Sequence, residues 1–238
     1  HNTNVNKFYT WFTNKLSILK ENHKSIYLID LNEIFYRFGS KEIFSDRNWY
    51  FARCRLSAKG LNILSESLLL VINRFSNAAS KVLVLDCDNT LWGGIIGEDG
   101  IKGIILGQDG IGSAYVDFQK EIVRHANDGV IIVLASKNND KDVWEVFDQH
   151  SGMYLKRDNV VTSKINWNEK AFNLKEVARE LDLGLDSFVF WDDNPLERDK
   201  MKTLLPQVLT VDVPDDIVQW PRLLRTINCF AKFKITED

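Results

Sequence analysis

Few cysteines, no long apolar run and no excess of basic residues characterise this 238-residue sequence. Its three cysteines, Cys54, Cys87 and Cys229, are odd in number, far apart and without a CxxC spacing, which argues against a disulfide framework and against a zinc site. Every apolar stretch is shorter than the roughly 18 residues that a membrane span needs. We therefore expect a protein of the reducing cytoplasm.

Positive charge is not in excess either. Lysine and arginine number 30 against 33 acidic residues, so the formal net charge is −3. No global positive field exists to attract nucleic acid or an anionic membrane. The sequence begins at His1 rather than Met, and its first residues lack the basic-then-apolar order of a secretory signal. We expect either an excised part of a longer polypeptide or the remnant of a tag at the start, and no signal peptide.

Hydrophobic patterning is abundant, since 45% of the residues are hydrophobic. That amount can fill one good-sized α/β core with an appendage. Residues 1–78 are expected to form an N-terminal α/β extension, and Ser76 to Ser80 is the best candidate boundary. Apolar spacing there predicts the following elements: a helix over Val5–Lys20, a buried strand over Ser25–Asp30, an irregular stretch over Gly39–Phe51, and a helix over Ala58–Phe75 capped by Ser57.

Strands and helices alternate through the expected core domain, residues 79–238. Strands are predicted over residues 81–86, 130–136, 159–163, 187–193 and 207–213. Helices are predicted over residues 113–128, 140–147, 168–181 and 195–204 and from Pro214 onward. The strands are apolar without polar alternation, as a parallel sheet covered on both faces requires. We therefore predict an α/β fold with a doubly wound parallel sheet and right-handed crossovers.

Acidic side chains cluster at the ends of the predicted strands. Asp86 and Asp88 follow the first strand, Ser136 ends the second, and Asp192 and Asp193 end the fourth. In such a sheet, ligands bind outside the carboxyl ends of the strands. Carboxylates that converge there repel one another unless a cation joins them, and Mg²⁺ is the natural partner. A phosphate would then be held by the metal, by Ser136 and by a lysine.

Two lysines are candidates for the phosphate contact. Lys170 lies at the start of the predicted helix that begins at Asn168, where its ammonium and the helix N-terminus can both face an anion. Lys164 is the alternative.

The order of these motifs, with D-x-D-N-T after a strand, then Ser, Lys and D-D, resembles the signature set of the haloacid-dehalogenase (HAD) superfamily over Lys81–Val213. That resemblance implies a HAD-like Rossmannoid sheet with a short flap or small cap. It implies that Asp86 is the nucleophile and a Mg²⁺ ligand. Asp88 would be the general acid and base, with its backbone carbonyl on the metal. Asp192 would complete the metal site and Asp193 would support it.

The same resemblance implies which residues contact the substrate. Thr90 and Ser136 would hydrogen-bond the phosphoryl oxygens. For Trp92, forming a pocket wall and simple packing are equally open. The glycine-rich stretch from Gly93 to Gly112 is expected to be the flap, although ordinary hairpin turns would have the same composition. The residues assigned to substrate binding are Asn89, Thr90, Trp92, Gly93, Lys137 and Asn138.

Four longer strings are similar to the FkbH-like branch of that superfamily: LDCDNTLWGGIIGEDG, ASKNN, INWNEK and FVFWDDNPLER. The similarity implies glyceryl transfer in polyketide biosynthesis. The glyceryl group of 1,3-bisphosphoglycerate would pass, with loss of phosphate, through a Cys87 thioester to the phosphopantetheine thiol of an acyl carrier protein. Small thiols are also commonly buried as hydrophobic residues. Two other hypotheses stay open: a plain Mg²⁺-dependent phosphatase in which Cys87 is inert, and a non-catalytic docking module.

Overall fold

The computed structural model describes residues 2–22, 31, 35, 39–76, 80–227 and 229–230. The chain divides into two compact units, His1–Ile72 and Asn73–Asp238. The strand expected over Ser25–Asp30 and the boundary expected after residue 78 both lie outside the described residues.

The first unit is helical where it is described. Its helices are α1 (Asn2–Asn22), α3 (Ser40–Ile43), α4 (Asp46–Ala52) and the part of α5 (Ala58–Ser76) up to Ile72, where the division between the units falls. Both α1 and α5 agree with the predicted helices, and Ser57 Oγ accepts a hydrogen bond from Gly60 N at 3.0 Å, as an N-cap should. The expected irregular stretch instead holds α3 and α4. There Ser45 Oγ accepts from Asn48 N, so a capping serine starts a helix that apolar spacing alone did not reveal.

The second unit is built on a five-stranded sheet with strand order β3-β2-β1-β4-β5 and only parallel pairings. The strands are β1 (Val82–Leu85), β2 (Ile131–Ser136), β3 (Val160–Ile165), β4 (Phe188–Trp191) and β5 (Leu209–Thr210). This confirms the predicted parallel α/β sheet. β5 is much shorter than the strand expected over residues 207–213, and its first residue, Leu209, is exposed.

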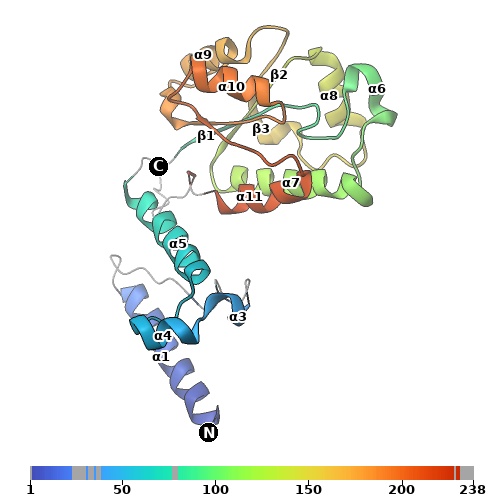
Figure 1. Cartoon of the computed structure of the whole chain (residues 1–238). Coiled ribbons are helices and arrows are strands. Elements are labelled where there is room, and N and C mark those ends of the chain that lie inside the picture. Colours follow the sequence, from blue (N-terminus) through green and yellow to red (C-terminus); the bar gives the residue numbers. More distant parts are fainter. Residues whose placement is uncertain are drawn as a thin grey trace. The chain divides into compact units, whose positions relative to one another are not determined.

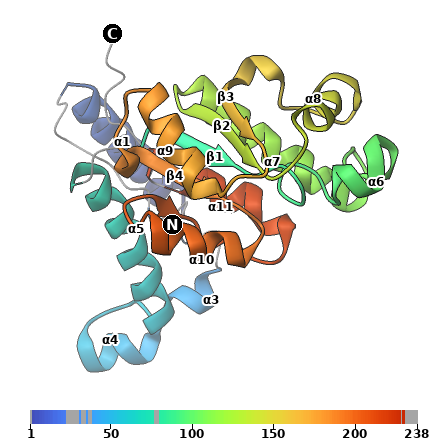
Figure 2. The same ribbon diagram turned by 90° about the horizontal axis from the view of Figure 1, so that it is seen from above.

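Helices cover both faces of the sheet (Figures 1 and 2). α7 (Gly110–Asn127) and α11 (Trp220–Thr226) contact each other on one face, and α9 (Lys170–Glu180) and α10 (Pro195–Leu204) pack on the other. Strand side chains alternate between two cores, since Leu83 and Leu85 point to the first face and Val82 and Val84 to the second. α6 (Ile96–Gly103), α8 (Asp140–Gln149) and three short 3₁₀ helices, Arg157–Asn159, Leu185–Ser187 and Ile217–Gln219, complete the unit.

The glycine-rich segment after β1 is a turn followed by α6, not a hairpin. Gly93 and Ile105 form an isolated antiparallel bridge that closes the segment at its base. Gly94 has a positive φ of 94°, and a Cβ there would lie 2.5 Å from Asp99 Oδ2, which itself accepts a hydrogen bond from Ile95 N. The glycine is therefore required by the close approach of Asp99. The helix could not be read from the sequence because glycines occupy so many of its positions.

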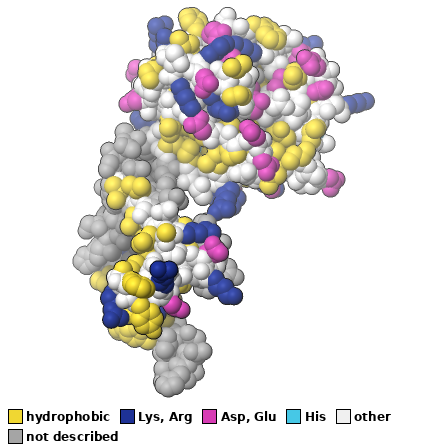
Figure 3. All heavy atoms as spheres, viewed as in Figure 1, with side chains coloured by type: hydrophobic (Ala, Val, Ile, Leu, Met, Phe, Trp, Pro, Cys, Tyr) yellow, Lys and Arg dark blue, Asp and Glu magenta, His cyan; other side chains and the backbone are white. Residues whose placement is uncertain are grey.

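Both units carry mixed surfaces. Basic and acidic side chains are interspersed on the face of the larger unit seen in Figure 3. The smaller unit exposes large apolar side chains, among them Phe8, Trp11, Tyr50 and Phe51. Among the described residues, no helix combines the length and apolar character of a bilayer-spanning segment.

A buried histidine predicts how the stability of the larger unit depends on pH. His125 on α7 is 6% exposed, its Nε2 lies 3.0 Å from Leu224 O, and its ring packs on Phe230. Burial lowers the pKa of His125 below its usual value. The unfolded chain therefore binds a proton more readily than the folded one, and His125 should reduce stability as the pH falls below about 6.5.

We expect that His125→Gln reduces this loss. Urea unfolding of both proteins between pH 5 and pH 8 tests it, because the difference between the two curves isolates residue 125 from the other titrating groups. Parallel curves would contradict the expectation.

Candidate active site

The ends of three neighbouring strands bring the site together. β1 lies between β2 and β4, with Leu85 opposite Leu134 and Trp191. Asp86 continues from β1, and its backbone N donates to Trp191 O at 3.1 Å. Asp192 follows β4 directly, and Ser136 is the last residue of β2. The parallel arrangement therefore places these side chains at one edge of the sheet, as their order in the sequence predicted.

Lys170 joins the acidic residues at this edge. It is the first residue of α9, and its side chain is 5% exposed. Its Nζ lies 2.8 Å from Asp86 Oδ1 and 2.7 Å from Asp192 Oδ2. Burial opposes its charge, but the two carboxylates outweigh burial and raise the pKa of Lys170 above its usual value. The alternative, Lys164, pairs with Glu176 and Glu180 instead.

Three carboxylates are arranged to hold a cation. Asp86, Asp192 and Asp193 each offer an oxygen, and these oxygens lie within 4.8 Å of one another. Burial, and after it the charge of Asp86, raises the pKa of Asp192 to about 6 and that of Asp193 to about 7. Burial is the larger cause of both shifts, and repulsion from Asp86 adds to it while Lys170 acts in the opposite direction. A divalent cation between them would relieve that repulsion.

Hydrogen bonding also fits a cation at this place. Asp86 Oδ1 is buried, and the contact that the described residues give it is with Lys170 Nζ, 2.8 Å away. By contrast, Asp192 uses both of its oxygens, accepting from Asn194 N at 2.9 Å and from Lys170 Nζ. Asp86 therefore has fewer protein partners than Asp192, and carboxylates are the ligands that Mg²⁺ and Ca²⁺ prefer.

Asp88 stands apart from the carboxylate trio. Its Oδ1 accepts hydrogen bonds from Trp92 Nε1 at 2.9 Å and from Ile96 N at 3.0 Å, and its Oδ2 accepts one from Asn138 Nδ2 at 2.8 Å. The Asp88 carboxylate therefore does not join the trio as a ligand. Coordination through its backbone carbonyl, implied by the resemblance, stays a prediction.

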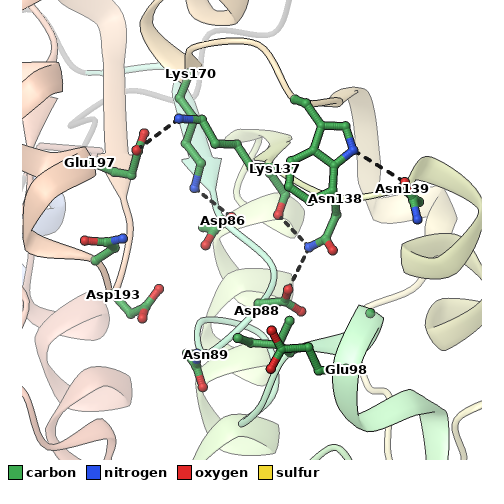
Figure 4. A pocket seen from close by; sticks show the side chains of 15 residues that line it. Asp86, Asp88, Asn89, Glu98, Lys137, Asn138, Asn139, Lys170, Asp193 and Glu197 are labelled. Atoms are coloured by element: carbon green, nitrogen blue, oxygen red, sulfur yellow. Dashed lines mark hydrogen bonds and ion pairs between the residues drawn. The ribbon is translucent and has the colours of Figure 1, made fainter.

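A cavity of about 540 Å³ lies next to these charged residues (Figure 4). In Figure 4 the side chains of Asp86, Asp88, Lys170 and Asp193 lie around the same space. The residues that line the cavity are Asp86, Asp88, Asn89, Ile95, Gly97, Glu98, Ser136, Lys137, Asn138, Asn139, Trp167, Lys170, Asp193, Asn194 and Glu197. Three of the residues assigned to substrate binding, Asn89, Lys137 and Asn138, are among them.

The other three residues assigned to substrate binding, Thr90, Trp92 and Gly93, do not line the cavity. Thr90 is fully buried, and its hydroxyl lies 3.4 Å from Asp193 Oδ1 and accepts from Asp193 N at 3.3 Å. Trp92 is fully buried as well, and Gly93 pairs with Ile105. Thr90 therefore holds Asp193, and the expected contact of these residues with the substrate is corrected. Asp192 is also enclosed, with no exposed surface.

Cys87 does not line the cavity, although its neighbour in space Ser136 does. Its side chain has no exposed surface and lies in the apolar core with Leu91 and Trp92. Burial, and then the charge of Asp86, raises the pKa of the Cys87 thiol well above its usual value. A thiol needs its anionic form and access to substrate in order to act as a nucleophile. In this structure the Cys87 thiol is not accessible to substrate, and its raised pKa disfavours the anionic form.

Several cavity residues were not predicted. Glu98 comes from α6, Asn139 precedes α8, and Trp167, 71% exposed, precedes α9. Glu197 lies at the start of α10, where Lys137 Nζ is 3.1 Å from its Oε1. Asn139, Trp167 and Glu197 stand inside strings already noted in the sequence, ASKNN, INWNEK and FVFWDDNPLER. For Asn139 and Trp167, a position shortly after a strand end was the available signal, whereas Glu197 lies in the first turn of α10.

Comparisons with known proteins give one strong structural likeness. A solved structure, the N-terminal part of the protein BF1531 from Bacteroides fragilis containing a phosphatase domain complexed with Mg, is similar with a TM-score of 0.85 and 32% identity. The likeness covers 95% of this chain, and the chain spans 60% of that structure's length. A haloacid dehalogenase-like family hydrolase from Xanthomonas campestris is similar over 63% of this chain and 96% of that chain, with 13% identity. Its TM-score is 0.42, too low to support an inference.

A scan against protein-family models found no match, and a search of curated proteins found none either. The structural likeness and the five-stranded parallel sheet together establish the fold. This chain has the HAD-like fold of a phosphatase domain.

Proposed function

We propose that the larger unit is a Mg²⁺-dependent phosphatase that hydrolyses phosphate monoesters through a phosphoryl group carried on Asp86. The observation that carries this proposal is the grouping of Asp86, Asp192 and Asp193 around buried Lys170 at the cavity. A scaffold has no use for four buried or half-buried charges in such proximity, because their desolvation is costly.

In the first step, an Asp86 carboxylate oxygen attacks phosphorus, and the bond between phosphorus and the leaving oxygen breaks. Asp88, within the same cavity, gives a proton to that leaving oxygen, so that the alcohol departs neutral. Lys170 and Ser136 also line the cavity, where the Lys170 ammonium balances the charge of the phosphoryl oxygens and the Ser136 hydroxyl donates a hydrogen bond to them.

In the second step, water attacks phosphorus, and the bond between phosphorus and Asp86 breaks. Asp88 takes up the proton of the water, which returns it to its starting state. Both steps need a carboxylate that can give and take a proton beside one that attacks. The contact of Lys170 with Asp86 and the hydrogen bond from Asn138 to Asp88 support this division of roles.

Mg²⁺ would be held by the carboxylates of Asp86, Asp192 and Asp193. When bound, it supplies positive charge against the phosphoryl oxygens and lets the acids approach a dianion. The Bacteroides fragilis phosphatase domain was solved in complex with Mg, which supports the choice of this metal.

The experiment that tests the phosphatase is phosphate release from simple monoesters. The protein is incubated with glycerol 2-phosphate or 2,4-dinitrophenyl phosphate, with Mg²⁺ or with a chelator. We expect turnover only with Mg²⁺. Equal rates with and without the metal would contradict the proposal, and so would the absence of turnover for both esters.

Metal binding itself can be measured without activity. We expect that Asp192→Asn weakens Mg²⁺ binding to the metal-free protein by at least about tenfold, because one of three carboxylate ligands is lost. Isothermal titration measures it, and Asp212→Asn is the matched control, since Asp212 is an exposed aspartate paired with Lys202. Unchanged affinity in Asp192→Asn would place the metal elsewhere.

A second candidate is glyceryl transfer to an acyl carrier protein in polyketide biosynthesis. What favours it is the similarity of the four long strings to the FkbH-like branch, with Cys87 between Asp86 and Asp88. The Cys87 sulfur would attack the acyl carbon of 1,3-bisphosphoglycerate, and the bond from that carbon to the phosphate oxygen would break. This leaves a 3-phosphoglyceryl thioester, whose phosphate monoester would be hydrolysed with Asp86 and Asp88. The phosphopantetheine thiol would then attack the thioester carbon, take the glyceryl group and release Cys87 as a thiol. A cytoplasmic location goes with either candidate, since the three cysteines are free.

Intact mass separates the two candidates. The protein is incubated with 1,3-bisphosphoglycerate and Mg²⁺, then quenched. A glyceryl adduct that is absent in Cys87→Ala supports transfer, and released phosphate without an adduct supports the phosphatase alone. The burial of Cys87 weighs against transfer, because its sulfur must first become accessible.

A further inference from the structure

The carboxylate of Asp88 is held by three donors from three different segments. Trp92 lies in the turn after β1, Ile96 starts α6, and Asn138 follows β2. Two of these donors, Trp92 Nε1 and Ile96 N, meet the same oxygen, Oδ1, at 2.9 and 3.0 Å. A carboxylate oxygen has two lone pairs in its plane, so Oδ1 is fully occupied by the protein.

Oδ2 is left to face the substrate. It accepts one hydrogen bond, from Asn138, whose side chain also reaches Ser136 Oγ at 3.2 Å. Asp88, Asn138 and Ser136 line the cavity together, and in Figure 4 Asn138 lies beside Asp88. One lone pair of Oδ2 therefore stays available on the cavity side. The donors on Oδ1 decide which way that lone pair is directed.

Trp92 can act only through Asp88. It is fully buried and does not line the cavity. Its indole has a single N–H, which is used on Asp88, and its ring packs edge-on against Phe147 with centroids 6.4 Å apart. The ring is thereby fixed from behind. A buried N–H with one acceptor gives Asp88 a rigid support that a solvated donor could not.

We propose that Trp92 is a positioning residue, which directs Asp88 Oδ2 at the leaving oxygen of the substrate. The proposal rests on the phosphatase function above, because it assigns a role in the proton transfer by Asp88. Misplacing a reacting group by about 1 Å can cost a hundredfold in rate. Loss of the indole N–H should therefore affect reactions that need the proton of Asp88, and spare those that do not.

Two phosphate esters separate these cases. Glycerol 2-phosphate has a poor leaving group that needs the proton, whereas 2,4-dinitrophenolate leaves without one. The quantity to measure is kcat/KM, which reports the steps up to departure of the leaving group. We expect that Trp92→Phe lowers kcat/KM for glycerol 2-phosphate by about tenfold to a hundredfold and changes it less than about threefold for 2,4-dinitrophenyl phosphate.

The chain offers a matched control in Trp144. Its Nε1 donates to Asp140 Oδ1, also four residues earlier, at 3.0 Å, and its ring also packs on Phe147, with centroids 5.0 Å apart. However, Trp144 does not line the cavity, and neither does its hydrogen-bond partner Asp140. We expect that Trp144→Phe leaves kcat/KM unchanged for both esters. An equal loss for both esters in Trp92→Phe would overturn the positioning role.

A double-mutant cycle gives a readout that simple damage to the fold would not. In the Asp88→Asn background, Trp92→Phe should have no further effect on glycerol 2-phosphate, and additive effects would overturn the proposal. If Trp92→Phe does not fold, site-specific replacement by 3-benzothienylalanine keeps the shape of the indole and removes only the N–H. A wild-type protein inactive on both esters would instead refute the phosphatase function, and the role of Trp92 with it.

Discussion

Asp86→Asn is expected to lower kcat/KM by at least about a thousandfold for good and poor leaving groups alike, because the attacking atom itself is lost. An amide cannot form the bond to phosphorus that a carboxylate forms. It also removes one of the three carboxylates that would hold Mg²⁺. The equal loss on both esters distinguishes this variant from changes at Asp88 and Trp92. Steady-state release of phosphate measures the effect.

The fold should survive this change, which makes the loss interpretable. Lys170 keeps its partner Asp192, and the repulsion from Asp86, which together with burial raises the pKa of Asp192 and Asp193, is removed. Asp215→Asn is the control, since Asp215 is an exposed aspartate on the loop before α11. Activity within about tenfold of wild type in Asp86→Asn would refute the assignment of the nucleophile.

Lys170→Met is expected to destabilise the metal-free protein by about 3–5 kcal/mol, because it leaves buried carboxylates without their cation. For a unit of this size that corresponds to a melting temperature lower by roughly 10 °C. The Lys170 side chain is 5% exposed and lies between two carboxylates, so no solvent compensates for its loss. Thermal unfolding in chelator measures the change. Excess Mg²⁺ should restore part of it, since the ion can replace the missing charge.

Lys164→Met is the matched control for this effect. Lys164 also pairs with two carboxylates, but its partners Glu176 and Glu180 have 39% and 46% exposed side chains. Pairs exposed to solvent contribute little, about 1 kcal/mol or less. If the two variants lost the same stability, Lys170 would not be the compensating charge of the site.

The sequence predicted the frame of the site because strand ends are fixed by local patterning. Asp86, Ser136 and Asp192 each follow an apolar run, and in a parallel sheet such positions meet at one edge. Lys170 was distinguishable from Lys164 by its place at a helix start, where its side chain returns to that edge. The strands could be recognised without alternation of apolar and polar residues, because both faces of the sheet are buried.

The turn after β1 was beyond prediction, because its path depends on contacts between distant residues. Thr90 was expected at the substrate, yet Asp193, far along the chain, captures its hydroxyl. Trp92 was left between pocket wall and packing. It proved to be buried with its N–H on Asp88, an arrangement that follows from the positive φ of 53° at Asn89 and the turn it starts. Spacing alone carries no signal for such a turn.

Cys87 shows the limit of a motif read one residue at a time. In an extended chain, neighbours point to opposite sides, so a thiol between two cavity aspartates faces the core. The alternation was visible in the sequence, but the resemblance to glyceryl transferases gave the residue a role that alternation opposes. The cavity residue Glu98 was missed for a different reason, since α6 was hidden among glycines.

Trapping the phosphoryl group tests the central claim most directly, because that claim is that Asp86 attacks phosphorus while Asp88 handles protons. Asp88→Asn should still be phosphorylated by 2,4-dinitrophenyl phosphate, whose leaving group needs no proton, but should hydrolyse the product slowly. Rapid acid quench and peptide mass spectrometry should then find one phosphoryl group on Asp86. No phosphoryl group on the protein, or one located on another residue such as Cys87, would contradict the account.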